Sequence, residues 1–211
     1  TTRLVGSEMC IRDRVYIDKG GSEMRIIVYC GASEGNEAIY LENARTLGKW
    51  IADNHHSLVY GGGNVGLMGE VANTVLEHDG RVVGVIPKFL ADREIAHNGL
   101  TDLIVVDNMS ERKNKILEIG DVCIALPGGP GTLEEISEVV SWSRIGQNDR
   151  PCILYNESGY YDLLEAFYDN MVDKGFLTQA DRDNVYFVKS IEILNEVIEN
   201  YREPEIRIYK K

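Results

Sequence analysis

The segment 127–135, PGGPGTLEE, concentrates residue types that could hold an anion and act on the molecule that carries it. Gly128, Gly129 and Gly131 allow the backbone to lie directly against a ligand. Thr132 could cap the helix that follows or donate its hydroxyl to an anion, and the free amides at a helix start favour phosphate. The segment lacks the G-K-[ST] ending of a Walker loop, which argues against a nucleoside triphosphate with magnesium. It therefore predicts a phosphate site of another kind.

A phosphate site alone would not need the two glutamates beside this loop, because their negative charges repel a phosphate. Glu134 and Glu135 could simply be first-turn acids that favour the helix dipole. Glu135 follows Thr132 by three residues, however, so both project from one helix face, and the helix N-terminus favours the ionised form of Glu135. A carboxylate near a sugar phosphate could stabilise a cationic anomeric carbon, bind sugar hydroxyls or orient a water. This pattern indicates cleavage at an anomeric carbon.

A pair of cations begins the preceding helix pattern, in the segment 109–113, MSERK. The helix dipole disfavours Arg112 and Lys113 at a helix start, so an anion could offset them, although solvated surface charges are an equal alternative. The rigid fork of Arg112 could clamp a phosphate or the bond to be cleaved.

A second glycine-rich segment, YGGGNVGLMG at 60–69, formally contains G-x-G-x-x-G. The dinucleotide fingerprint also needs an acidic residue at the end of the next strand, and that strand ends Val85-Ile86-Pro87-Lys88. The glycines could serve only a tight turn and close helix packing. We prefer the interpretation that the backbone approaches a ribose or phosphate without a full dinucleotide.

The elements that must position these motifs alternate between two patterns. Apolar runs that predict strands are 25–29, 57–60, 81–86, 103–106, 122–126, 152–155 and 185–188. Amphipathic stretches that predict helices are 38–51, 67–77, 110–119, 133–145, 161–174 and 191–201. Strands without polar alternation are typical of parallel sheets covered on both faces. We expect an α/β fold with a doubly wound, Rossmann-like, mostly parallel sheet, helices on both faces and ligands at the carboxyl ends of the strands.

Length and composition favour one domain, over residues 24–211 of the 211. Residues 1–23 have no sustained periodicity and contain a string, GSEMCIRDR, that resembles a translated sequencing adapter, so we expect a disordered or artefactual tail. The 34 acidic and 22 basic residues give a net charge of −12, which disfavours nucleic acid and anionic lipid as partners.

Cys10, Cys30, Cys123 and Cys152 show neither C-x-x-C nor zinc spacing, so we expect reduced, buried thiols in a cytoplasmic protein. No apolar segment is long enough to span a bilayer and no signal peptide is recognisable, so we expect no membrane partner.

Taken together and in this order, YGGGNVGLMG, MSERK and PGGPGTLEE resemble the LOG family of cytokinin riboside 5′-monophosphate phosphoribohydrolases, earlier described as lysine decarboxylases. The resemblance runs from Met24 to about Tyr201 and implies hydrolysis of the N-glycosidic bond of an adenine-type nucleoside 5′-monophosphate. It implies Arg112 and Glu135 as catalytic residues. The residues expected to contact substrate are Gly62, Gly63, Met68, Glu94, Met109, Lys113, Gly128, Gly129, Gly131, Thr132, Glu134 and Ser141.

The resemblance also implies a homodimer and no metal or organic cofactor. Pro130 departs from the tyrosine common in plant members, which puts preference for a prenylated adenine in doubt. Lysine decarboxylation would need a lysine in a pyridoxal phosphate setting, and a metal hydrolase would need more than Glu94 and His97. The remaining alternative is a non-catalytic nucleotide carrier or sensor on the same fold.

Overall fold

A computed structural model describes residues 23–91, 93, 96–204 and 206 of the chain. The expected tail lies outside these residues apart from Glu23, and so do Cys10 and Glu94.

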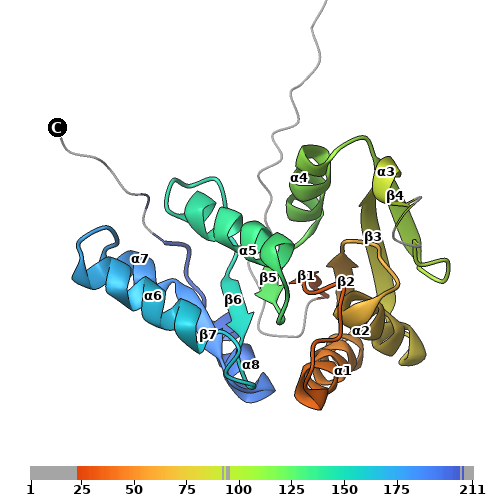
Figure 1. Cartoon of the computed structure of the whole chain (residues 1–211), viewed down its shortest axis with the longest axis horizontal. Coiled ribbons are helices and arrows are strands. Elements are labelled where there is room, and N and C mark those ends of the chain that lie inside the picture. The colour runs from red at the N-terminus through yellow and green to blue at the C-terminus, as the bar shows by residue number, and fades with distance from the viewer. Residues whose placement is uncertain (1–22, 92, 94–95, 205, 207–211) are drawn as a thin grey trace, which may run out of the picture.

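The centre of the molecule is one parallel sheet with the strand order β4-β3-β2-β1-β5-β6-β7 (Figure 1). Its strands are β1 (Arg25–Tyr29), β2 (Ser57–Tyr60), β3 (Arg81–Pro87), β4 (Asp102–Val106), β5 (Val122–Ala125), β6 (Cys152–Tyr155) and β7 (Val185–Val188). Every pair of neighbouring strands is parallel. The predicted single-domain, doubly wound α/β fold is confirmed.

Helices cover both faces of the sheet, as Figure 1 shows, with α1, α2 and α8 below it and α4 and α5 above. The lower layer contains α1 (Ala38–Asp53), α2 (Gly66–Glu77) and α8 (Ile191–Asn200), and the opposite face packs against α4 (Met109–Ile119), α5 (Pro130–Ser143) and α6 (Asp162–Asp173). Two short helices, α3 (Lys88–Ala91) and α7 (Gln179–Asp183), were not predicted, because four or five residues are too few to show helical periodicity. No helix in the described part of the chain is both long and apolar enough to cross a membrane.

The two helical layers explain the unalternating strands. Within β1, Ile26 and Val28 point into the core shared with α1 and α2, whereas Ile27 and Tyr29 point into the core shared with α4 and α5. Every residue of β2, β5 and β6 is buried. Because both faces of a central strand lose contact with water, apolar residues are favoured at every position.

Helix α5 begins three residues earlier than the sequence predicted, at Pro130 rather than Leu133. Proline suits this first position because its fixed φ matches the helix and its missing N–H would have had no partner. The N-cap residue is Gly129, with no side-chain cap, so Thr132 lies inside the first turn and does not cap the helix.

The sheet changes winding direction between β1 and β5, which are hydrogen-bonded neighbours. The loops that leave their carboxyl ends are joined by the amide of Gly31, which donates to the carbonyl oxygen of Pro127 at 3.0 Å. Loops that diverge from such a switch point leave a crevice, the usual ligand position in open α/β sheets.

We expect Gly66→Ala to lower the free energy of unfolding in urea by about 2–4 kcal/mol. Gly66 has φ +58°, and a Cβ there would lie 2.3 Å from the carbonyl carbon of Ala32. Gly131→Ala is the matched control, since its Cβ would meet nothing within 4 Å and alanine favours the helix by up to about 1 kcal/mol. Equal stability of Gly66→Ala and the native chain would contradict this packing.

Candidate active site

A cavity of about 580 Å³ opens at the carboxyl ends of β1 and β5. Its walls come from the loop after β1, the start of α2, the start of α4, the glycine loop after β5 and the first turn of α5. The lining residues among those predicted from sequence are Met68, Met109, Arg112, Gly128, Gly129, Gly131, Thr132, Glu134 and Glu135. The fold therefore brings the glycine loop after β5 and both predicted catalytic residues to one cavity.

The three positions of the loop after β5 that hold glycine differ in why they do so. A Cβ on Gly128 would lie 2.2 Å from Oγ1 of Thr132 and 2.8 Å from the amide nitrogen of Gly31, so internal packing requires glycine there. A Cβ on Gly129 or Gly131 would meet nothing within 4 Å, and neither residue has a positive φ. Neither the backbone conformation nor protein packing requires glycine at these two positions. Close approach of a ligand to the loop is the remaining physical reason.

Arg112 places its guanidinium inside the cavity, with the residue only 7% exposed. Nη2 donates to the carbonyl oxygen of Gly61 at 3.2 Å, and Nη1 lies 3.8 Å from Sδ of Met109. A Cβ on Gly61 would lie 1.9 Å from Nη2, so the glycine makes room for the side chain. Nε is buried without a hydrogen-bond partner, and no carboxylate among the described residues forms an ion pair with this guanidinium. A buried cation with spare donors favours an anionic or strongly polar ligand.

Glu135, which also lines the cavity, has a carboxyl group whose pKa is raised. Burial raises the pKa of its carboxyl from 4.5 to about 7, although the nearby Arg112 and Lys113 lower it and Glu134 and Glu138 raise it. The sequence predicted that the helix N-terminus would favour the ionised form, but desolvation is the larger effect here. Both protonation states are therefore populated near neutral pH, which suits a group that accepts or gives a proton.

Lys113 has a different environment from its neighbour Arg112. Its ammonium pairs with Glu134 at 2.5 Å and with Glu138 at 2.7 Å, and these hydrogen bonds raise the pKa of Lys113. Since Lys113 lies on α4 and both carboxylates lie on α5, the ion pairs tie together the two helices that carry Arg112 and Glu135. The sequence suggested that an anion offsets the charges of Arg112 and Lys113. For Lys113, the protein's own carboxylates fill this role.

The first glycine loop packs against the protein more than against the cavity. Gly62 and Gly63 are buried and do not line the cavity, unlike Met68. Gly62 has φ +80°, and Gly63 forms an isolated bridge with Ala96. These positions favour the turn-and-packing alternative for the glycines of segment 60–69.

One other predicted contact, Ser141, is not brought to the cavity. Ser141 is exposed on α5, six residues beyond Glu135, and does not line the cavity. Glu94 lies outside the described residues.

Sequence reasoning missed the loop 30–35 after β1, together with Tyr40 and Tyr160, all of which line the cavity. The loop could have been found, because it follows the first strand, at the switch point. Tyr40 and Tyr160 gave no signal, since 11 tyrosines occur along the chain and neither of these two belongs to a recognised motif.

Cys30 also lines the cavity, as a buried free thiol. Burial raises its pKa well above the ordinary range, so the neutral thiol predominates. Cys123 and Cys152 are likewise free and buried, as expected. The described residues contain no group of three or more His, Cys, Asp or Glu side chains that could hold a metal ion, and His97 is hydrogen-bonded to Asn73 at 2.8 Å.

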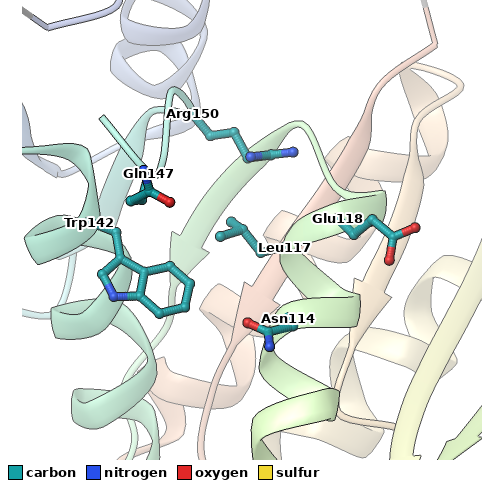
Figure 2. Close-up of a pocket in the computed structure, with 6 residues that line it drawn as sticks. All are labelled: Asn114, Leu117, Glu118, Trp142, Gln147 and Arg150. Atoms are coloured by element: carbon teal, nitrogen blue, oxygen red, sulfur yellow. The ribbon is translucent and has the colours of Figure 1, made fainter. Parts of the chain in front are cut away.

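Figure 2 shows a second cavity, of about 500 Å³, where Trp142 of α5 faces Leu117 and Asn114 of α4. The guanidinium of Arg150 donates to the carbonyl oxygen of Gly120 at 2.6 Å and to Asp149 at 3.3 Å. Because this cation is already engaged and no glycine-loop amides line the cavity, the first cavity is the better candidate for chemistry.

The burial of Glu135 predicts a pH-dependent stability. The raised pKa means that the ionised form is penalised in the folded state, so stability falls as pH rises from about 4.5 to about 7. Glu135→Gln should therefore raise the free energy of unfolding by on the order of 2 kcal/mol at pH 8 and much less at pH 5. Urea unfolding at both pH values measures this difference. Glu118→Gln, at an exposed side chain, is the control, and an equal effect of Glu135→Gln at the two pH values would show that its burial is misjudged.

Comparison with known proteins adds family relationships to this geometry. A family model described as "Possible lysine decarboxylase" matches residues 68–199. A cytokinin riboside 5′-monophosphate phosphoribohydrolase from Rhodococcoides fascians is 46% identical over 168 residues, which are 79% of this chain and 85% of that protein. A protein of the same description from Arabidopsis thaliana is 41% identical over 179 residues, covering 84% of this chain and 83% of that protein.

Solved structures share the fold at lower identity. The molybdenum cofactor carrier protein from Chlamydomonas reinhardtii has a TM-score of 0.64 at 22% identity, over 85% of this chain and all of that chain. The molybdenum cofactor binding protein from Rippkaea orientalis has a TM-score of 0.63 at 24% identity, over 84% and 96% of the two chains. At these identities the likeness concerns the fold alone. Because the family model matches more than half of the chain and the named relatives match most of it at over 40% identity, the chain belongs to the LOG family, the cytokinin riboside 5′-monophosphate phosphoribohydrolases.

Proposed function

We propose that this protein hydrolyses the N-glycosidic bond of adenine-type nucleoside 5′-monophosphates, either AMP or its N6-modified forms, to the free base and ribose 5-phosphate. One observation carries the proposal: a single cavity joins the unobstructed glycine loop to a partly buried carboxylate and to a buried guanidinium that has no ion-pair partner among the described residues. The descriptions of the relatives name the same reaction class.

The glycine loop is the proposed phosphate site. The amides of Gly131 and Thr132 belong to the first turn of α5, where backbone donors have no partner within the helix. The helix dipole adds a partial positive charge at this end. Open space at Gly129 and Gly131 lets an anion approach the backbone. The 5′-phosphate would thereby anchor the nucleotide and restrict the positions open to its ribose.

Glu135 is the proposed catalytic carboxylate. It lies one helical turn beyond Thr132, so a ribose attached to the bound phosphate can place its anomeric carbon nearby. As the glycosidic bond breaks, its electron pair leaves with the base, and the ionised carboxylate stabilises the cationic carbon. Water then adds to that carbon and its proton passes to Glu135. The departing base takes up this proton, which restores the ionised carboxylate.

Arg112 is proposed to orient the nucleotide and to stabilise the negative charge of phosphate and leaving base. Its contacts with Gly61 and Met109 fix the guanidinium, whose Nε has no hydrogen-bond partner among the described residues. Lys113 is proposed to support the site indirectly, because its ion pairs with Glu134 and Glu138 hold α4 and α5 together.

The direct test is release of free base from AMP and from isopentenyladenosine 5′-monophosphate, followed by chromatography. We expect release from both nucleotides and at least a hundredfold less from adenosine, because the phosphate contacts anchor the substrate.

Glu135→Gln should bind AMP but release no base. The rate of base release by the native chain should rise as pH increases through about 7, since the ionised carboxylate is the reactive form.

Tight AMP binding without release would instead support the carrier or sensor alternative. Unchanged release by Glu135→Gln would remove Glu135 from the mechanism. A native rate that falls as pH rises through 7 would show that the protonated carboxyl is the reactive form.

We further propose that the protein is a cytoplasmic homodimer. The free thiols of Cys123 and Cys152, which are paired in register on neighbouring strands, support a reducing compartment. Leu133 and Ile145 are 46% and 51% exposed near the two ends of α5, and Val105 of β4 is 55% exposed, so large apolar side chains are available for an interface. Sedimentation equilibrium should give twice the 23.7 kDa chain mass, and a monomer at micromolar concentration would contradict the dimer.

A further inference from the structure

Two consecutive tyrosines from the loop after β6 reach back to the glycine loop. The hydroxyl of Tyr160 donates to the carbonyl oxygen of Gly128 at 2.5 Å. The hydroxyl of Tyr161 donates to the carbonyl oxygen of Leu126 at 2.6 Å. Tyr161 is buried, whereas Tyr160 is 44% exposed and lines the cavity. The two hydrogen bonds look equivalent, but the peptides that they hold are chemically different.

Tyr160 holds a peptide that has a donor to present. In a trans peptide the carbonyl and the following N–H point in opposite directions, so a fixed Gly128 carbonyl also fixes the direction of the Gly129 N–H. That N–H donates to no other group in the described part of the chain. Since Gly129 lines the cavity and a Cβ on it would meet nothing within 4 Å, the space beside this amide is open.

Tyr161 holds a peptide that has no donor. The residue after Leu126 is Pro127, which lacks an N–H. The Tyr161 hydrogen bond therefore fixes the loop without presenting a donor at that peptide. The chain thus provides its own control for the effect of a tyrosine hydroxyl on this loop.

The ring of Tyr160 is held from two sides. It meets Tyr161 edge to face, with centroids 5.0 Å apart, and Tyr40 edge to face at 5.9 Å. Tyr40 is itself fixed by a hydrogen bond to Glu37 at 3.0 Å and packs beside Gly35. Because these ring contacts survive loss of the hydroxyl, phenylalanine at position 160 should keep the ring in place.

We propose that Tyr160 is a positioning residue for the phosphate site: its hydroxyl holds the Gly128–Gly129 peptide so that the Gly129 N–H faces the 5′-phosphate. This inference rests on the proposed function. The buried guanidinium of Arg112, which lines the same cavity and has no ion-pair partner among the described residues, independently favours a polar or anionic ligand there. The affinity for a phosphate monoester should therefore depend on the Tyr160 hydroxyl. The affinity for the same sugar and base without the phosphate should not depend on it.

The test compares Tyr160→Phe with Tyr161→Phe. Affinities for AMP, ribose 5-phosphate and adenosine are measured by calorimetry in chains that also carry Glu135→Gln, which prevents turnover. Steady-state base release and thermal unfolding are measured in chains that retain Glu135.

We expect Tyr160→Phe to weaken AMP and ribose 5-phosphate about tenfold, since a hydrogen bond to a charged group is lost or misdirected, and to leave adenosine binding unchanged. KM for AMP should rise by a similar factor while kcat stays within about twofold and the unfolding temperature hardly changes. Tyr161→Phe should lower the unfolding temperature by several degrees, because a buried hydrogen bond is lost, and leave KM within about twofold.

Unchanged affinity of Tyr160→Phe for both phosphate ligands would overturn the proposal, as would an equal loss for adenosine, which would indicate altered packing. An equal rise of KM in Tyr161→Phe would show that general loop rigidity, and not the Gly129 amide, is responsible. If the native chain released no base while Tyr160→Phe still weakened ribose 5-phosphate selectively, the proposed function would fail and the role of Tyr160 would stand.

Discussion

The structure depends on keeping the buried Arg112 and the partly buried Glu135, whose charges are opposite when both are ionised, in one cavity without pairing them to each other. A direct ion pair would satisfy both groups and leave neither for a ligand. Instead the guanidinium rests against the Gly61 carbonyl, and the carboxyl responds to burial with a pKa of about 7. Holding both groups apart requires rigid supports, which are the two helices that carry them and the sheet beneath. The ion pairs of Lys113 with Glu134 and Glu138 connect those helices at the cavity rim.

Much of this arrangement could be predicted from the sequence, because its main determinants are local. A strand buried on both faces favours apolar residues at nearly every position. The predicted strands 57–60 and 152–155 therefore matched β2 and β6 residue for residue. The carboxyl ends of parallel strands share one edge, which is why the motifs around Arg112 and Glu135 could be expected to converge. The short helices α3 and α7 and the early start of α5 could not be predicted from periodicity, since their limits depend on single turns and on Pro130.

The rest of the site depends on contacts between distant segments. Arg112 and Lys113 are adjacent and chemically similar, yet a rotation of about 100° along the helix directs one into the cavity and the other towards α5. Gly62 and Gly63 belong to a glycine-rich motif but are buried and do not line the cavity, whereas Gly129 and Gly131 line it and have no internal requirement for glycine. Tyr160 carried no signal because its partner, the Gly128 carbonyl, is 32 residues away in the chain. Residue type thus suggested the chemistry, and only tertiary structure separated the residues that line the cavity from those that support it.

A crystal structure of Glu135→Gln with AMP would test the central claim most directly, because it locates phosphate, ribose and base together. The account predicts the phosphate within hydrogen-bond distance of the amides of Gly129, Gly131 and Thr132, the anomeric carbon facing the side chain of residue 135, and the Arg112 guanidinium on the nucleotide. Phosphate bound away from the glycine loop, or a ribose turned away from residue 135, would contradict it.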